Sequence, residues 1–557
     1  MHRVDSVFPC VSVTLCFKKR KSRYNPPVFD LLSCIMLLKK GMHFYLVIGL
    51  FAVYLINGLI AIPRNSVTYD EMDHWSYGKR ILKLQPQLVY PYDDAGSSPF
   101  YGVNALPRAV EQLINPDLLK TDGGFSDIMN GRYVTLIICM LIGIFIYSWS
   151  KEMFGETAGL FSLFLFVFCP NMNAYSMIFT SDAYTALCCL SAFYFFWKFV
   201  RYPVYKYFIF FSISLGISLI MKYSLIHLLP IFAILSIIVL LKRKTLFSHW
   251  KKNLLRLVVS GSIILIIMNA AYFFYGTGQS LSGYHFRSSF FQSLQTSFLG
   301  NLPLPLPVPY VEGFDITYHM MELGAGHPLV SAKNYILGEL STDGFWYFYI
   351  VVFFFKTSIP YLAIILLLAF MYIKQRKIDL LSAEFMIGFG LLYYLIVFSS
   401  LVSVQAGIRH ILFIYPLLYV LAGRVVNVTW KPKMKKVAVV ILVTWLVAGF
   451  YFYFPNLLSY TNEFILNKRD AYKIMAESNL DFGQCDFAIK KYLKQHTDVK
   501  LADSIPRPGK FVVGVNYYLN IYGDNRLEWV KKFKPVCHID HCYLLIEVKE
   551  EDLKRIQ

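Results

Sequence analysis

Long apolar runs separated by short polar segments dominate this sequence from residue 43 to residue 455. Most runs hold roughly 15 to 22 residues, and a helix needs about 20 apolar residues to cross a bilayer. We expect eleven membrane-spanning helices, at about 43–62, 132–149, 157–170, 182–200, 205–221, 223–241, 255–275, 357–373, 383–402, 410–423 and 437–455. The pattern predicts a polytopic α-helical membrane protein.

The placement of charge gives a direction to these helices. The net charge is +19, and the basic residues cluster in short segments such as 18–23, 242–256, 374–377 and 431–436. Basic segments that alternate with acidic or neutral ones form the positive-inside pattern. We therefore place the basic N-terminal segment 1–42 in the cytoplasm and the chain in the inner membrane. The charge is then a topology signal with an attraction to membrane lipids, and it argues against nucleic acid as a partner.

Three large pieces fall outside the cytoplasm in this orientation. They are the loops 63–131 and 276–356 and the C-terminal tail 456–557. The tail mixes a helical pattern (DFAIKKYLKQ) with strand-like runs (GKFVVGVNYYLNIY and CYLLIEVK), so we expect it to form a small α/β domain after the transmembrane domain 43–455. The sequence has no evident inverted or tandem repeat, which weakens a transporter interpretation.

Ionisable residues stand at the outer ends of several expected spans. They are Asp70 and Glu71 after the first span, Asp182 at the start of the fourth, Lys222 between the fifth and sixth, Lys356 before the eighth, and Arg409 and His410 before the tenth. Ionisable groups at membrane depth are costly and usually face a cavity or a partner. We expect these carboxylates and cations to converge at one face of the membrane.

Group transfer from a lipid phosphate fits such a set of residues. Arg binds phosphate through a bidentate fork and Lys through a compact charge. A carboxylate beside them can take a proton from an acceptor hydroxyl as a general base. A polyprenyl-phosphate sugar is the natural donor, because its lipid stays in the bilayer while its anomeric carbon lies at the aqueous edge.

The quoted residues resemble the GT-C superfamily of membrane glycosyltransferases, which includes protein O-mannosyltransferases and lipid A aminoarabinose transferases. The resemblance rests on the Asp-Glu pair after the first span and on four longer stretches, which together cover roughly residues 43 to 490. These are GLFSLFLFVFCPNMNAYSMIFTSDAYTALCCLSAFYFFWKF, NYILGELSTDGFWYFYIVVFFFKTSIP, AGIRHILFIYPLLYVLAG and FPNLLSYTNEF with SNLDFGQ. It implies sugar transfer from a polyprenyl- or dolichyl-phosphate donor to an extracytoplasmic protein, lipid or glycan, usually with inversion at the anomeric carbon.

The resemblance also implies roles for single residues. Asp70 would be the general base or orient the acceptor, Glu71 would support it, and Asp182 would be the second carboxylate. The donor phosphate would be bound by a set of cations: Lys222, Lys356, Arg409 and His410. His74 lies four residues after Asp70 and shares its face if this stretch is helical. These acids with His74 could also hold a divalent cation, so the cofactor requirement stays open.

Less specific interpretations exist for each feature. Asp70 and Glu71 could begin a surface helix, where acids suit the helix dipole, and Asp182 could cap a helix. Lys222 and Lys356 could extend toward lipid headgroups. For the whole chain, the alternatives are a transporter of lipid-linked glycans or a non-catalytic membrane scaffold.

The tail contains the motif CHIDHC at 537–542. Structural zinc usually needs two separated ligand pairs, whereas an extracytoplasmic domain favours disulfides. One disulfide of this motif, with Cys485 as a candidate partner, a zinc site and free thiols are the three alternatives.

Overall fold

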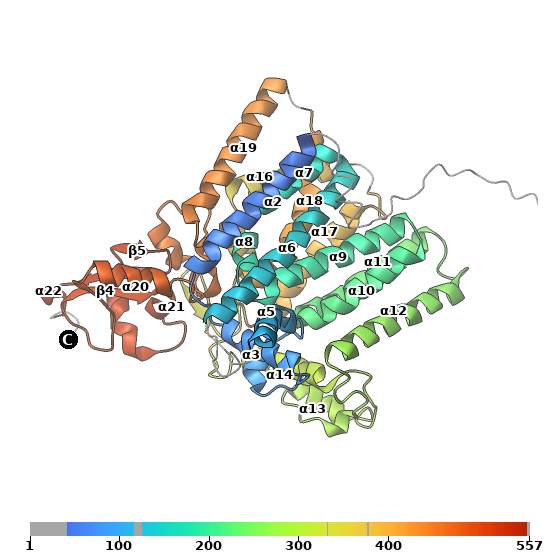
Figure 1. The fold of residues 1–557 in the computed structure, drawn as a ribbon, viewed down its shortest axis with the longest axis horizontal. Helices are drawn as coiled ribbons and strands as arrows, with labels where there is room; N and C mark the ends of the chain where they lie inside the picture. The colour runs from blue at the N-terminus through green and yellow to red at the C-terminus, as the bar shows by residue number, and fades with distance from the viewer. Residues whose placement is uncertain (1–41, 116–124, 331, 376–377, 430, 554–557) are drawn as a thin grey trace, which may run out of the picture. The chain divides into compact units, whose positions relative to one another are not determined.

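The computed structural model describes residues 42–115, 125–330, 332–375, 378–429 and 431–553. The predicted cytoplasmic segment 1–42 lies outside these residues except for Met42. The described chain is mostly helical (Figure 1). Its long apolar helices are α2 (Met42–Ala61), α6 (Phe125–Phe154), α7 (Glu156–Val167), α9 (Ser181–Arg201), α10 (Tyr205–Met221), α11 (Leu228–Lys242), α12 (Trp250–Ala271), α16 (Ile359–Ile373), α17 (Ala383–Leu401) and α19 (Pro432–Tyr453).

The number of membrane crossings is between seven and nine by length and composition of the described helices. The higher number counts two bent pairs as one span each: α7 with α8 (Pro170–Ser176), and α15 (Phe348–Lys356) with α16. A proline stands in the first turn of α8 and of α16, where its missing N–H is tolerated and a new helix can start. Two further expected spans, 205–221 and 410–423, coincide with shorter apolar helices, Tyr205–Met221 and Ile414–Asn427. Eleven crossings therefore stay a prediction.

Helix α9 is central to the packing of the described spans. It packs against α6 and α10, and α10 packs in turn against α12. Nearly all side chains of α9 are buried, whereas Met268 and Asn269 are the buried residues of α12. The apolar side chains that α12 exposes are those expected of a lipid-facing helix. Asp182 is the second residue of α9, and its side chain is buried among the packed helices.

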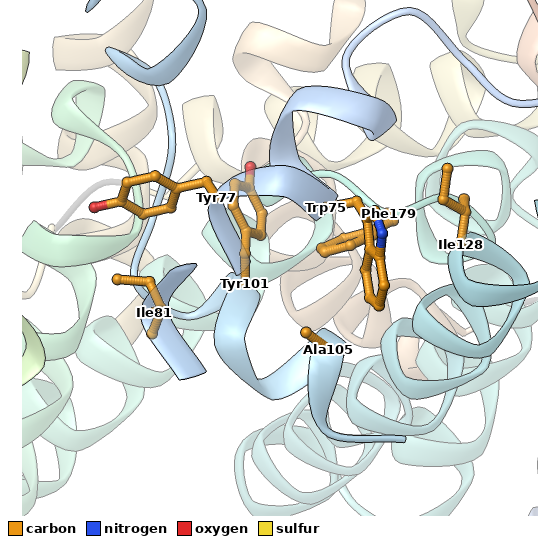
Figure 2. Close-up of a cluster of buried hydrophobic side chains, with 7 residues drawn as sticks. All are labelled: Trp75, Tyr77, Ile81, Tyr101, Ala105, Ile128 and Phe179. Carbon is orange, nitrogen blue, oxygen red and sulfur yellow. The ribbon is translucent and has the colours of Figure 1, made fainter. Parts of the chain in front are cut away.

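The loop predicted to lie outside, 63–131, contributes three helices in its described part, α3 (Glu71–Leu82), α4 (Pro91–Asp94) and α5 (Tyr101–Ile114). A buried apolar cluster joins α3 to α5, to α6 and to the turn before α9 (Figure 2). Its members are Trp75, Tyr77, Ile81, Tyr101, Ala105, Ile128 and Phe179. Their burial fixes the first turn of α3 beside the first turn of α9. The other large loop predicted to lie outside, 276–356, contributes α13 (Ser289–Gln295), α14 (Val308–Leu323) and the hairpin of β1 (Asn334–Ile336) and β2 (Glu339–Ser341).

The tail forms the expected small sheet with helices. Its strands are β3 (Val499–Leu501), β4 (Gly509–Gly514), β5 (Cys537–Ile539) and β6 (Tyr543–Val548), in the order β3-β4-β6-β5. The β3–β4 pair is parallel, and β4–β6 and β5–β6 are antiparallel. The tail helices are α20 (Asp486–Gln495), α21 (Val515–Tyr518) and α22 (Glu550–Leu553). Ile489 of α20 packs against Val499, Val512 and Ile539 of the sheet.

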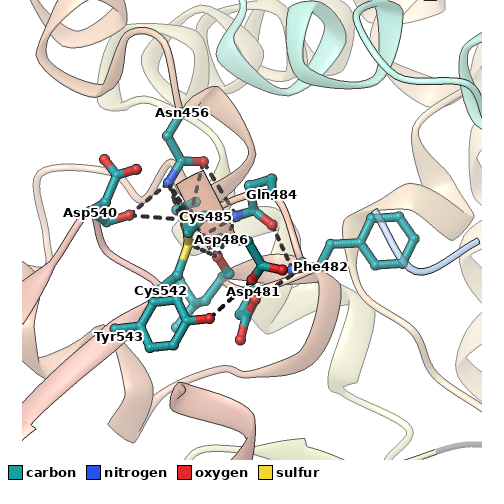
Figure 3. The surroundings of a disulfide bond; sticks show 12 residues. Asn456, Asp481, Phe482, Gln484, Cys485, Asp486, Asp540, Cys542 and Tyr543 are labelled. Carbon is teal, nitrogen blue, oxygen red and sulfur yellow. Dashed lines mark hydrogen bonds between the residues drawn. A yellow bond between two sulfur atoms is a disulfide. The ribbon is translucent and has the colours of Figure 1, made fainter. Parts of the chain in front are cut away.

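A disulfide joins the beginning of α20 to the loop before β6 (Figure 3). It links Cys485 to Cys542, whereas Cys537 is a free, exposed thiol. The side-chain amides of Asn456 and Gln484 lie 3.1 Å from Cys485 Sγ and Cys542 Sγ respectively. Of the three alternatives for CHIDHC, the structure has the disulfide. A disulfide forms in an oxidising compartment, which agrees with the expected extracytoplasmic tail.

We predict that Cys485→Ser destabilises the tail. The bond closes a stretch with a sequence separation of 57, and a loop of this size corresponds to about 4 kcal/mol of unfolded-state entropy. Thermal unfolding of the purified protein should show an earlier transition, and Cys537→Ser should unfold as the wild type does. Peptide mass mapping without reduction should detect the 485–542 link, and its absence would contradict the assignment.

Candidate functional site

A fully buried ion pair fixes the beginning of α3. Arg132 of α6 donates from Nε to Glu71 Oε1 at 2.7 Å and from Nη2 to Oε2 at 2.6 Å. Both side chains have 0% exposure. Burial on its own would raise the pKa of Glu71, but the charge and hydrogen bonds of Arg132 outweigh it and lower the pKa. Glu71 is therefore held as a carboxylate.

The remaining hydrogen bonds of this pair connect three parts of the chain. Glu71 accepts from the backbone N–H groups of Thr68 and Phe179, each at 2.7 Å. Arg132 donates to the carbonyls of Ile62, Asn65 and Ser66. Because both partners are saturated and inaccessible, Glu71 is placed to position Asp70 rather than to touch a substrate. The sequence-based prediction omitted Arg132, although a charged residue at the beginning of an apolar run was a visible signal.

Asp70 lies next to the Glu71–Arg132 pair and is accessible to solvent. It is the N-cap residue of α3, and its carboxylate pairs with the guanidinium of Arg409 in the short helix η5 (Ile408–Ile411). Its side chain is 34% exposed. Burial pushes the pKa of Asp70 upward, but the charges of Arg409 and His74 lower it below its ordinary value. Asp70 is thus an ionised carboxylate with access to solvent.

A second carboxylate–cation pair joins α9 to the end of α10. Lys222 Nζ donates to Asp182 Oδ1 at 2.6 Å. Lys222 occupies the break between α10 and the short helix η3 (Tyr223–His227), where the backbone is extended. Asp182 lies in the first turn of α9, and Thr180 is the N-cap residue. The alternative of Asp182 as the capping residue is wrong, because its carboxylate binds Lys222 instead.

The two ion pairs belong to one site. Asp182 interacts electrostatically with Arg409 and His410 as well as with Lys222. Asp70 also interacts with Lys222. Five of the residues expected from the sequence therefore come together from four different segments, since Arg409 and His410 are both in η5.

Two histidines flank these pairs. His410 Nδ1 lies 3.0 Å from the hydroxyl of Tyr349. His74 is on α3, so the stretch after Asp70 is helical, and it interacts with both Asp70 and Asp182. Its Nδ1 lies 3.1 Å from the carbonyl of Phe179, and a carbonyl can only accept, so Nδ1 carries the hydrogen.

Lys356 does not join this group. Its ammonium donates to the carbonyls of Leu458 at 2.7 Å and Asn479 at 2.8 Å. The residue is 1% exposed. Two of its three N–H groups are directed at backbone carbonyls, so the structure places Lys356 as a clamp between α15 and the beginning of the tail. The predicted contact of Lys356 with a donor phosphate would require this buried side chain to become accessible.

The tail adds residues that the sequence-based prediction did not include. Glu477 interacts with both Arg409 and Asp70, and its backbone has a φ of 57°, a left-handed conformation uncommon for a glutamate. The ring of Phe482 lies under the Arg409 guanidinium at 4.6 Å. Within the described residues, no group of three or more His, Cys, Asp and Glu side chains is arranged to hold a metal ion.

We predict that the Glu71–Arg132 pair is required for folding. Glu71→Ala would leave a buried guanidinium without its partner, and such a loss typically costs about 3–5 kcal/mol. The matched control is Glu156→Ala, which breaks an exposed pair with Lys151 and should cost below about 1 kcal/mol. Thermal unfolding in detergent measures both variants. Equal unfolding temperatures would contradict the anchoring role.

Comparison with known proteins supports the resemblance in one segment. The sequence model of the dolichyl-phosphate-mannose-protein mannosyltransferase family matches residues 124–272, which include Arg132, Asp182 and Lys222. A comparison with curated proteins gives no match.

Similar solved structures come from bacteria and archaea. ArnT from Cupriavidus metallidurans bound to undecaprenyl phosphate has a TM-score of 0.48 at 13% identity, over 87% of this chain and 75% of that chain. The oligosaccharyltransferase AglB from Archaeoglobus fulgidus, in complex with an inhibitory peptide and a dolichol-phosphate, has a TM-score of 0.43 at 14% identity. The match covers 72% of this chain and 55% of that chain. The family match confirms, over residues 124–272, the resemblance to the membrane glycosyltransferases of the GT-C superfamily.

Proposed function

We propose that the chain is an integral-membrane glycosyltransferase that transfers a sugar from a polyprenyl- or dolichyl-phosphate donor to an extracytoplasmic acceptor. The observation that carries this proposal is the pair of adjoining ion pairs, Asp70–Arg409 and Asp182–Lys222, at the ends of apolar helices. A donor phosphate and an acceptor hydroxyl need a cation and a carboxylate side by side. The donor would enter from the lipid and the acceptor from water.

The cations have unused donors for a phosphate. Lys222 has three N–H groups and Arg409 has five. In the hydrogen bonds of the structure, Lys222 Nζ donates to Asp182, and Arg409 donates to Asp70 and to the carbonyl of Ala406. A donor phosphate at their remaining N–H groups would replace part of the carboxylate contact. His410 lies close enough to interact with both cations and supports the same subsite.

Asp70 is our candidate for the general base. As the acceptor oxygen attacks the anomeric carbon, its proton passes to a carboxylate oxygen of Asp70. The bond between the anomeric carbon and the phosphate oxygen breaks, and the lipid phosphate leaves with its charge balanced by Lys222 and Arg409. Asp182 is buried and orients Lys222. Attack opposite to the leaving phosphate inverts the anomeric carbon.

The location of the charges favours an enzyme over a transporter. A transporter places its polar groups near the bilayer midplane, whereas Asp182 and Lys222 stand at the start of α9 and the end of α10. The inner membrane, the cytoplasmic N-terminus and the extracytoplasmic tail remain part of the proposal. The disulfide of the tail supports this orientation.

We predict that Asp70→Asn abolishes sugar transfer in a folded protein. Loss of a general base typically reduces the rate by about 10²–10⁴-fold. The assay follows radiolabelled sugar from a panel of polyprenyl-phosphate sugars into membranes. The matched control is Asp73→Asn, one turn further along α3, which should keep wild-type transfer.

Each outcome of this experiment has a separate meaning. Equal transfer by Asp70→Asn and wild type would remove Asp70 from the mechanism. No transfer by wild type with any donor of the panel would count against the enzyme and favour the transporter or scaffold. A parallel series with EDTA determines whether a divalent cation is required.

We predict that the acid limb of the pH–rate profile lies below about pH 4. A base must be ionised, and Asp70 has a pKa held below the ordinary aspartate value of about 3.9. Its activity is therefore present above that value and is lost as pH falls through the lowered pKa. Asp73 provides the contrast, because burial and the charges of Asp93 and Asp70 raise its pKa to about 6. An acid limb near pH 6 in kcat/KM would point to Asp73 instead.

A further inference from the structure

Three tyrosines form an exposed aromatic surface where the first outer loop meets the tail. Tyr69 is 51% exposed, Tyr517 is 41% exposed and Tyr522 is 42% exposed. We refer to these three side chains as the tyrosine platform. Large exposed aromatic groups that cluster usually mark an interaction site.

The platform is held in place by polar bonds. The rings of Tyr517 and Tyr522 lie 5.3 Å apart between centroids, and the phenol of Tyr69 interacts with both. Asn516 donates to the hydroxyl of Tyr522 at 3.2 Å, and the backbone N–H of Tyr69 donates to the carbonyl of Phe482 at 3.1 Å. Rings fixed in this way lose little conformational entropy when they bind a ligand.

The platform borders the site around Asp70. Tyr69 directly precedes Asp70 in the chain, and the centroids of the Tyr69 and Phe482 rings lie 6.2 Å apart. The Arg409 guanidinium packs on the same Phe482 ring. Tyr522 interacts with Glu477, which in turn interacts with Arg409. A molecule bound on the platform would therefore reach Asp70.

A buried carboxyl lies among these rings. Asp481 is 5% exposed, and its Oδ1 accepts the backbone N–H of Gly483 at 3.0 Å. It interacts with Tyr69, Tyr522 and Tyr543. Tyr543 itself donates to Asp486 at 3.1 Å (Figure 3). Burial, reinforced by the charges of Asp486 and Glu477, raises the pKa of Asp481 to about 7 despite the hydrogen bond from Gly483.

We propose that the tyrosine platform binds the acceptor and that the acceptor is a glycan. The inference rests on the proposed function and assigns the acceptor class of the same site. A sugar ring has an apolar C–H face and a polar hydroxyl edge, and a tyrosine offers the same combination. The ring faces would contact the sugar, and the phenols with Asp481 would bond its hydroxyls, which directs one hydroxyl toward Asp70.

The strand arrangement favours a glycan over a polypeptide. Polypeptides often bind by adding a strand to a free sheet edge. Tyr517 and Tyr522 follow β4, which pairs with β6 along its whole length and with β3 along Lys510–Val512. The edge strands of this sheet are β3 and β5, so the platform offers side-chain rings and hydroxyls beside an inner strand.

The test measures binding by the full-length protein in lipid nanodiscs. The probes are neutral oligosaccharides of two to six hexoses and hexapeptides containing Ser or Thr, and isothermal titration gives the affinities. The double variant Tyr517→Ala/Tyr522→Ala should weaken oligosaccharide binding by about tenfold or more, because each aromatic contact contributes measurably. Tyr517→Phe/Tyr522→Phe keeps the ring faces and removes two phenols, so its affinity should lie between those of the wild type and the alanine variant. The matched control is Tyr205→Ala, an exposed tyrosine at the far end of α10.

Transfer kinetics separate this inference from the proposed function. In the double alanine variant the acceptor KM should rise and the donor KM should stay unchanged, whereas Asp70→Asn should lose transfer and keep oligosaccharide binding. Oligosaccharide binding without any transfer by wild type would overturn the enzyme and retain the glycan site. Three results would overturn the glycan platform: peptide binding that depends on the tyrosines, no oligosaccharide binding by wild type, or equal binding by the alanine variant. Thermal unfolding confirms that each variant is folded.

Discussion

The geometry of the site depends on one buried ion pair, Glu71 with Arg132. Two charges without solvent carry a desolvation cost that their attraction offsets only when every remaining donor and acceptor is bonded. Here the bonds reach the end of α2, the start of α3 and the turn at Phe179 before α9. The pair therefore holds the start of α3, with Asp70, at a fixed distance from the start of α9, with Asp182. The apolar cluster of Figure 2 joins the same segments, and its member Phe179 donates its backbone N–H to Glu71.

Without a ligand, the site neutralises its own charges. Asp70 pairs with Arg409 and Asp182 with Lys222, so neither cation is left unpaired near the apolar helices. In our proposal, a phosphate that competes for the cations also loosens the carboxylates. Donor binding would then release Asp70 for the acceptor, and a site with donor bound would be more basic than an empty one. The difference in exposure between Asp70 and Asp182 explains why the first is suited to meet the acceptor and the second to orient a cation.

The sequence predicted the parts of this arrangement that depend on local pattern. Apolar run length identified the helices, and ionisable residues at run ends identified Asp70, Asp182, Lys222 and Arg409 as neighbours. The sequence pattern could not show that Lys222 and Lys356 have different roles. Lys222 has spare N–H groups, whereas the ammonium of Lys356 binds backbone carbonyls that lie far along the chain. Nor could the pattern find Glu477, because its position depends on long-range packing of the tail. Span number was equally unreliable, since proline-containing bends split two apolar runs into shorter helices.

The tail is part of the site and not an attachment to it. The backbone N–H groups of Ser66 and Tyr69 donate to the carbonyls of Gln484 and Phe482, so the first loop and the tail share a short ladder beside Asp70. The disulfide at Cys485 follows this ladder directly. Any displacement of the tail would move Phe482, and with it the surface against which Arg409 rests. In our proposal, recognition of an acceptor on the tail and the charge balance at Asp70 would therefore be coupled through Phe482 and Arg409.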